Sequence, residues 1–421
     1  MDNKNKGLNQ IISFSIGVSI SVFFAFLLSV LVSYKLPQSD AGLFFLLNSF
    51  INLLAVLSMF GLQQYWIKFL TYPVLDKKNL IYDYLTIIVS TTFWLICFFI
   101  FFYFSYQEIL KEINFLYVIL FISFLIGSIF FETLLIKLQV QLNFTLYGFL
   151  VTVPNLFRFT FSFFALLMLN DFFYLSLGQF LTTIFLLLLA FFFLKKDWID
   201  LGHTLDHLNF KDFFKHAIKF FKGNYKYLLV NLIFVFHVQT PIIYSSYILN
   251  AEKIAILGVS YTLFLGFFFF PNLLIQRYLF PIMANTKKLK KSRRISYFLE
   301  SLIILFIGFL ILILGYYLSE IIINTIFPVA YKESITLFKI IIFALPLKLL
   351  VSYLVNICVL NDLTSYLNRI LIFGLIINLL IFLIFYQIFT LNIIFYSLTV
   401  FEAVFIFLIL SIILNNRSKI A

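Results

Sequence analysis

The sequence predicts an all-α protein that crosses a membrane about twelve times, with its helices in two lobes of six. The first observation is composition, because 63% of the 421 residues are hydrophobic and only 11% are charged, far from the values of soluble domains. The second is that apolar runs of about 20 residues, enough to cross about 30 Å of hydrocarbon, recur from end to end. The third is one long hydrophilic stretch, residues 195–226, between two sets of six runs.

Twelve runs have the length and composition of a membrane span. They are residues 11–34, 42–70, 80–106, 115–137, 147–169, 172–194, 227–249, 255–284, 297–318, 334–360, 369–389 and 393–414. Each is predicted to be a helix, because a strand with an open edge would leave backbone groups unpaired in lipid. The first run is too long for a signal peptide and no small-x-small cleavage site follows it, so we expect a retained span.

The hydrophilic stretch divides the chain into an N-terminal lobe (1–194), a cytoplasmic amphipathic linker (195–226) and a C-terminal lobe (227–421). In the linker, lysines at helical spacing share one face: Lys211, Lys215, Lys219, Lys222 and Lys226. Apolar residues share the opposite face: Phe210, Phe213, Phe214, Ala217, Phe220 and Phe221. This pattern predicts a helix that lies on the anionic inner leaflet and tethers the lobes. The alternative is an ordinary solvated linker helix.

The distribution of basic residues predicts the orientation. If the N-terminus is cytoplasmic, 22 of the 30 Lys and Arg residues fall in cytoplasmic flanks and loops, four fall in outer loops and four fall within spans. Lys and Arg collect in cytoplasmic segments, so we expect both termini in the cytoplasm. The net charge of +12 is explained by topology, and no nucleic-acid partner is needed.

Enzymatic chemistry has little room in the loops. The longest outer segment, residues 319–334, carries Glu320 and Glu333 without a nucleophile and base arrangement, and no glycine-rich phosphate loop is present. The group His207, Asp212 and His216 lies among lysines and favours a solvated face over a metal site. Cys97 and Cys358 lie within spans without ligand spacing, which predicts packing residues. We therefore expect a transporter rather than an enzyme, with no cofactor or metal.

A resemblance to a known family rests on three segments. Residues 34–70, "YKLPQSDAGLFFLLNSFINLLAVLSMFGLQQYWIKFL", resemble the junction of the first and second spans of polysaccharide-export flippases, the O-antigen (Wzx-like) branch of the multidrug/oligosaccharidyl-lipid/polysaccharide (MOP) exporter superfamily. The residues that carry the likeness are Pro37, Gly42, Gly61, Leu62, Gln63 and Gln64. Residues 322–346 are similar to the junction of the ninth and tenth spans, with Pro328 where a Gly is usual, and residues 254–284 also fit, through Gly258 and Pro281.

The resemblance implies a fold, a cargo and a mechanism. Such flippases move an undecaprenyl-pyrophosphate-linked oligosaccharide, such as an O-antigen or capsule repeat unit, across the bacterial cytoplasmic membrane by alternating access. The implied partners are this lipid-linked oligosaccharide, membrane lipid and H⁺ or Na⁺ as a coupling ion, with the protein working as a monomer. The seventh span of the family often carries an acidic residue, where this sequence has His237 and Gln239.

Charged and polar residues inside the spans are the candidates for a site, because a buried charge is costly and its retention indicates a role. The candidate cations for a pyrophosphate are Arg158, Lys348, Arg277 and Lys339. The candidate polar residues of a cavity are Asn48, Asn52, Asn155, His237, Thr240 and Tyr244. Glu132 and Glu402 are candidates for ion coupling, since desolvation raises a carboxyl pKa.

Each interpretation has an alternative. Arg158 could pair with Glu132 or Glu402 to hold the bundle together, and Arg277 and Lys339 could snorkel to the interface. The small residues Ser13, Gly17 and Ser21 could form either a loosely held portal helix or an ordinary tight contact. For the whole protein, the alternatives are a drug or cation antiporter of the same superfamily, which should have an acidic cavity, and a non-transporting scaffold without one.

Overall fold

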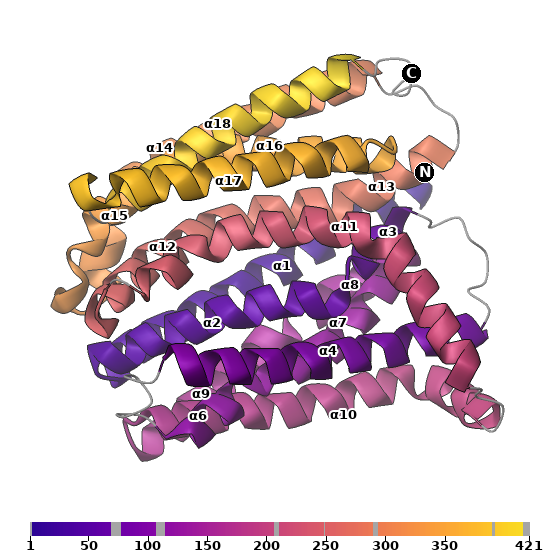
Figure 1. The fold of residues 1–421 in the computed structure, drawn as a ribbon, viewed down its shortest axis with the longest axis horizontal. Helices are drawn as coiled ribbons and strands as arrows, with labels where there is room; N and C mark the ends of the chain where they lie inside the picture. The colour runs from indigo at the N-terminus through magenta and orange to yellow at the C-terminus, as the bar shows by residue number, and fades with distance from the viewer. Residues whose placement is uncertain are drawn as a thin grey trace.

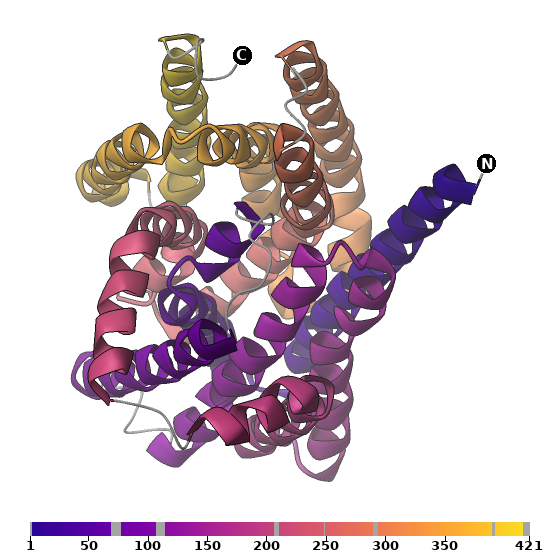
Figure 2. The same cartoon turned by 90° about the vertical axis from the view of Figure 1, so that its right-hand side faces the viewer.

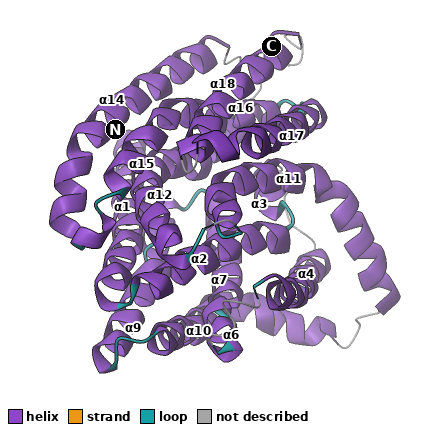
Figure 3. Cartoon of the chain, turned by 60° about the vertical axis from the view of Figure 1, so that its left-hand side comes forward, coloured by secondary structure: helices purple, strands orange, loops and turns teal. Residues whose placement is uncertain are grey.

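A computed structural model describes residues 2–68, 77–106, 114–205, 210–247, 249–288, 294–389 and 392–415. In these ranges the regular elements are all helices (Figure 3). The first half contains α1 (Asp2–Lys35), α2 (Gln38–Met59), α3 (Leu62–Lys68), α4 (Lys77–Ser105), α6 (Phe115–Ile122), α7 (Phe124–Val140), α8 (Phe144–Leu150), α9 (Val153–Met168) and α10 (Phe172–Leu205). The second half contains α11 (Phe210–Ser245), α12 (Ala251–Leu273), a π-helix η1 (Leu274–Leu279), α13 (Phe280–Lys288), α14 (Arg294–Ile326), the short 3₁₀-helix η2 (Val329–Tyr331), α15 (Ser334–Ile341), the 3₁₀-helix η3 (Ile342–Ala344), α16 (Leu345–Leu360), α17 (Thr364–Phe389) and α18 (Asn392–Asn415).

The predicted all-α membrane fold is confirmed. Nine helical stretches in the described ranges are long and apolar enough to cross a membrane, and each coincides with a predicted run. The other three predicted runs, 227–249, 369–389 and 393–414, fall on α11, α17 and α18, where only part of the side chains is described.

Several predicted runs are interrupted helices rather than straight ones. The pattern predicts a single span over 42–70, but α2 ends at Met59, because Phe60 and Gly61 have φ angles of 47° and 74°. A Cβ on Gly61 would lie 2.5 Å from the backbone nitrogen of Leu228, so the close approach of α11 needs a glycine at this position. The run 255–284 changes to a π-helix at Leu274 after Pro271, whose ring removes a backbone donor.

The two halves of the chain lie on opposite sides of the bundle (Figure 1). Helices α4, α6, α9 and α10 lie on one side, and α14 to α18 lie on the other. Between them, α2 packs against α11 and α12, and α1 packs against α12. The start of α1 and the end of α18 lie at the same end of the bundle (Figure 1), which we call the terminal end.

The small residues of α1 form a tight contact with α8 and α9. A Cβ on Gly17 would lie 1.7 Å from the carbonyl oxygen of Gly148, which shows how closely the two backbones approach. Ser13 donates a hydrogen bond to the Thr145 carbonyl at 3.2 Å. The small-residue ridge is therefore used for tight packing in this conformation.

Where the structure describes it, the segment predicted as the linker is formed by extensions of two long helices. Its first part belongs to α10, which continues to Leu205, and its second part belongs to α11, which begins at Phe210 and runs on into the bundle. Viewed from the terminal end, the first part of α11 lies at the edge of the molecule and runs across that end rather than along the bundle (Figure 2).

Candidate functional site

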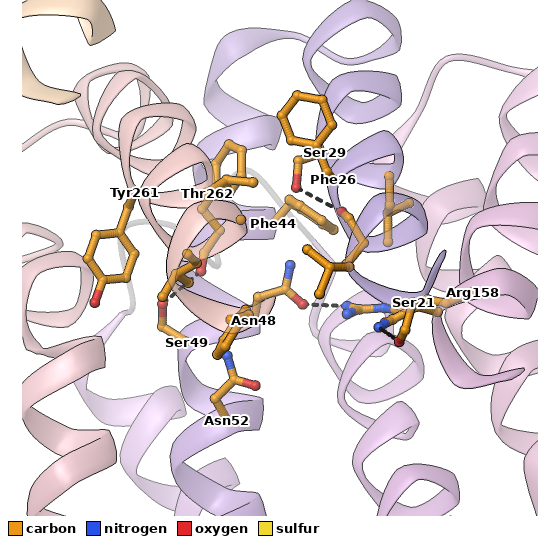
Figure 4. Close-up of a pocket in the computed structure, with 18 of the residues that line it drawn as sticks. Ser21, Phe26, Ser29, Phe44, Asn48, Ser49, Asn52, Arg158, Tyr261 and Thr262 are labelled. Carbon is orange, nitrogen blue, oxygen red and sulfur yellow. Dashed lines mark hydrogen bonds between the residues drawn. The ribbon is translucent and has the colours of Figure 1, made fainter. Parts of the chain in front are cut away.

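A cavity of about 300 Å³ lies where the two halves meet. Helices α1, α2 and α9 of the first half and α11 and α12 of the second half line it. Its polar lining residues are Ser21, Ser29, Asn48, Ser49, Asn52, Asn155, Arg158, Gln239, Tyr261 and Thr262. Figure 4 shows Arg158 and Ser21 on one side of this central cavity and Tyr261 on the other, with Asn48 and Asn52 between them.

Among the described residues, Arg158 is the one charged side chain that lines the central cavity. It lies on α9, one turn after Pro154, which occupies the first turn of that helix, where its missing N–H is not needed. Its guanidinium donates hydrogen bonds to the side-chain oxygens of Gln179 and Asn48. The guanidinium carbon also lies 4.3 Å from the centre of the Phe124 ring, a cation–π distance.

The partners of Arg158 are neutral. Across the described ranges, no carboxylate lies within ion-pair distance of Arg158. The two glutamates considered as its partners pair elsewhere, Glu132 with Arg277 and Glu402 with Lys348. The alternative that Arg158 neutralises one of these glutamates therefore does not apply to this conformation. The positive charge of Arg158 is held by amides and rings at the wall of a cavity.

Gln179 of α10 holds the guanidinium in place and was missed in the sequence. The buried Gln179 accepts a hydrogen bond from Arg158 and donates one to the Ser162 hydroxyl at 2.8 Å. The adjacent Gly178 allows this approach, since a Cβ there would lie 2.6 Å from the Cα of Ser162. A glutamine inside the apolar run 172–194 was the available signal.

A second chamber of about 380 Å³ adjoins the central cavity toward the terminal end; we call it the amide chamber. The two spaces share Ser21, Asn52, Asn155 and Leu273 in their walls, so they lie side by side. Asn155 is held in this shared wall by donating a hydrogen bond to the Ser21 hydroxyl at 3.0 Å. Polar residues found only in the amide chamber are Gln63, Ser128, Glu132, Asn231 and Arg277.

An ion pair joins the two halves in the wall of the amide chamber. Arg277 of η1 contacts Glu132 of α7. Gln139 reinforces the contact by donating to the backbone carbonyl of Arg277 at 3.1 Å and accepting from its guanidinium at 3.3 Å. Toward the same end, Gln64 exchanges hydrogen bonds with Asn231, and Lys68 pairs with Asp362. These contacts join the two halves toward the terminal end of the bundle.

The remaining candidates lie elsewhere. Lys348 and Glu402 form a buried pair at 2.7 Å within the second half, and neither lines the two spaces above. Lys339 pairs with Glu320 at 2.5 Å on the outer surface of that half. Tyr244 packs beside the apolar core. The side chains of His237 and Thr240 lie outside the described residues.

An apolar groove of about 330 Å³ opens beside the central cavity, between α1, α12 and α14. Its lining is apolar except for Ser19. The groove shares Val22, Phe26 and Gly266 with the central cavity, and nothing lies within 4 Å of where a Cβ of Gly266 would be. The three spaces are thus adjacent: an apolar groove, a cavity with one cation and an amide chamber.

Solved structures show which fold this is. The chain superimposes on the eukaryotic MATE transporter AtDTX14 with a TM-score of 0.74 and 12% identity, covering 99% of this chain and 97% of that one. The chain has a MATE-like fold. The MATE multidrug transporter DinF-BH matches with a TM-score of 0.70 and 14% identity over 97% of this chain and 95% of that one.

A solved flippase structure also superimposes on this chain. The lipid II flippase MurJ, in an inward closed conformation, matches with a TM-score of 0.65 and 14% identity over 96% of this chain and 87% of that one. No protein-family model and no curated protein sequence matches the chain. At these identities the likeness establishes the fold, and the cargo has to be argued from the cavities.

Proposed function

We propose that the chain is a flippase for an anionic amphiphile, an oligosaccharide linked through pyrophosphate to a polyprenyl lipid, which it moves across the membrane by alternating access. The proposal places it in a bacterial cytoplasmic membrane, as a monomer with both termini in the cytoplasm. The MATE-like fold is shared by transporters, including one flippase of a lipid-linked precursor.

The observation that carries the proposal is that Arg158 lies in the cavity wall with neutral hydrogen-bond partners. A guanidinium inside a membrane bundle costs about 2.5 to 3.5 kcal/mol on insertion scales. Within the described residues this cost is not offset by a carboxylate, since the hydrogen-bond partners of Arg158 are the amides of Gln179 and Asn48. A guanidinium forms strong paired hydrogen bonds with phosphate oxygens, so a pyrophosphate in the cavity would supply the missing negative charge.

The adjoining spaces match the other two parts of this cargo. The apolar groove lies laterally between α1, α12 and α14, where a lipid tail could enter from the bilayer. The amide chamber offers the donors and acceptors that sugar hydroxyls need, from Gln63, Asn155 and Asn231. Arg158 lies in the cavity that touches both spaces.

The described lining argues against the two alternatives. An exporter of cations should have an uncompensated acid in its cavity, whereas the one carboxylate that lines the two polar spaces, Glu132, is neutralised by Arg277. A scaffold should pair off its buried charges, as Lys348 and Glu402 do, and leave no cavity. A scaffold therefore does not explain the cavity, or an arginine in its wall that is held by neutral amides.

The test compares transport with stability. Purified protein is reconstituted in liposomes with fluorescent lipid-linked oligosaccharide, and leaflet exchange is scored by quenching from outside. We expect Arg158→Ala to lose transport by about 100-fold or more, from the loss of a charge-assisted contact of about 1.5 to 3 kcal/mol together with misplacement of the cargo. Arg158→Lys should keep part of the activity, because it keeps the charge without the planar fork.

The matched control is Arg369→Ala, which removes an exposed arginine from α17. It should transport like the unchanged protein, and both alanine variants should melt at a similar temperature in detergent. A stable Arg158→Ala variant with normal transport would refute the proposed role of Arg158. Transport of a cationic dye by the unchanged protein, without exchange of the lipid-linked oligosaccharide, would establish the antiporter instead.

A further inference from the structure

We infer that the first part of α11, residues 210–226, is a binding surface for an anionic phospholipid leaflet; we call it the α11 surface segment. This surface is separate from the cavities and does not depend on the proposed cargo. Three faces of one helix carry the inference.

The first face is covered by protein. Phe220 is buried, and Phe221 beside it lies 4.4 Å from Phe60, measured between ring centres. His216 forms a 2.8 Å contact with the buried Asp83 of α4. These contacts hold the segment against the first half and fix which of its sides face outward.

The second face is apolar and largely exposed. Phe214, Ile218 and Tyr225 are 54%, 53% and 46% exposed. They follow one another at spacings of four and seven residues, which places them in one stripe along a helix. A solvated helix would be expected to carry polar residues on such a stripe, so its apolar character indicates contact with a non-aqueous phase.

The third face is basic. Lys215, Lys219 and Lys222 are exposed, and their spacing of four and three residues places them in a second stripe directly beside the apolar one. A helix with an apolar stripe and an adjacent lysine stripe lies in the boundary between headgroups and acyl chains, with its lysines among the headgroups. Lysines in this position attract anionic lipid.

The position of the segment fits this partner. It runs across the terminal end of the bundle, at the edge of the molecule, while the rest of α11 runs along the bundle (Figures 1 and 2). Because the bundle crosses the membrane, a helix that lies across its end lies along the membrane surface. Because the segment is continuous with the rest of α11, the bundle holds it at the membrane surface.

The experiment measures which lipid lies against the apolar stripe. Full-length protein with Ile218→Cys, in a Cys97→Ser and Cys358→Ala background, is labelled with a fluorophore and placed in nanodiscs. Quenching is compared for phosphatidylglycerol and phosphatidylcholine, each carrying a headgroup nitroxide at equal mole fraction. We expect stronger quenching by phosphatidylglycerol, with a preference that decreases as salt is added.

Charge variants separate this surface from general charge effects. Replacing Lys215, Lys219 and Lys222 together by Gln should lower the preference by about fivefold for each lysine at low salt, and replacing them by Arg should retain it. The control replaces by Gln three lysines that lie outside the α11 surface segment: Lys35 at the end of α1, Lys253 at the start of α12 and Lys332 directly after η2. It should leave the preference unchanged.

Three results would overturn the inference. Equal quenching by the two lipids would mean that the segment does not select anionic headgroups. No quenching by either lipid would mean that the segment is a solvated linker. An equal loss of preference in the control variant would assign the effect to net charge. None of these results bears on Arg158, so the failure of this inference and that of the proposed function are distinguishable.

Discussion

The buried pair of Lys348 and Glu402 predicts a large and non-additive effect on stability. Both side chains are 2% exposed, and the lysine nitrogen lies 2.7 Å from a carboxylate oxygen. At an effective dielectric constant of about 20, two unit charges at this distance attract each other by about 6 kcal/mol. Removing two ions from water costs several kcal/mol for each, so attraction and desolvation nearly cancel for the intact pair.

Removing one partner destroys this balance. Glu402→Leu leaves a buried ammonium and Lys348→Met leaves a buried carboxylate, so each single variant should lose about 3 to 5 kcal/mol of unfolding free energy. The double variant replaces both charges with apolar side chains, and we expect it to be within about 1 kcal/mol of the unchanged protein, or more stable. The coupling between the two changes should therefore be several kcal/mol.

Unfolding in mixed detergent micelles, with SDS as the denaturant, gives these free energies for the four proteins of the cycle. Lys339→Ala is the matched control, because it breaks the exposed pair with Glu320 and should leave stability unchanged. If Glu402→Leu alone is as stable as the unchanged protein, or if the two single effects add in the double variant, the interpretation of a buried charged pair is refuted.

Two further predictions concern packing and orientation. Gly17→Val should destabilise the protein by about 1 to 3 kcal/mol, because the valine side chain would push against the carbonyl of Gly148. The loss should appear as a lower melting temperature in detergent. In a Cys97→Ser background, Lys219→Cys should resist a membrane-impermeant maleimide in intact cells with a permeable outer envelope, whereas Lys332→Cys should react. Labelling of position 219 alone would show that the bundle has the opposite orientation.

The fold class could be predicted because the bilayer imposes strict rules on the sequence. Every backbone group in hydrocarbon needs an internal partner, so apolar runs such as 11–34 and 172–194 had to be helices. The break after Met59 was not predicted, because the apolar pattern continues through it. At this break Gly61 lies close to the backbone of α11, a contact that the local sequence does not reveal.

The sequence also pointed to Arg158, since an arginine in an apolar run is costly wherever it lies. It could not assign the partners of the buried charges. Glu132 pairs with Arg277, 145 residues away, and Glu402 pairs with Lys348, 54 residues away, and these choices follow from which helices pack together. That packing leaves Arg158 with amides and removes Lys348 from the central cavity.

Tertiary structure also decided the role of the linker pattern. The sequence determined that residues 210–226 form an amphipathic helix with lysines at helical spacing, because helical periodicity is local. Which apolar residues stay exposed depends on contacts with distant helices. Phe220 is buried in the protein, while Phe214 and Ile218 remain exposed beside the lysines. Composition and periodicity thus determined the helices, and only their packing decided which side chains meet, which charges are neutralised and which apolar surfaces stay exposed.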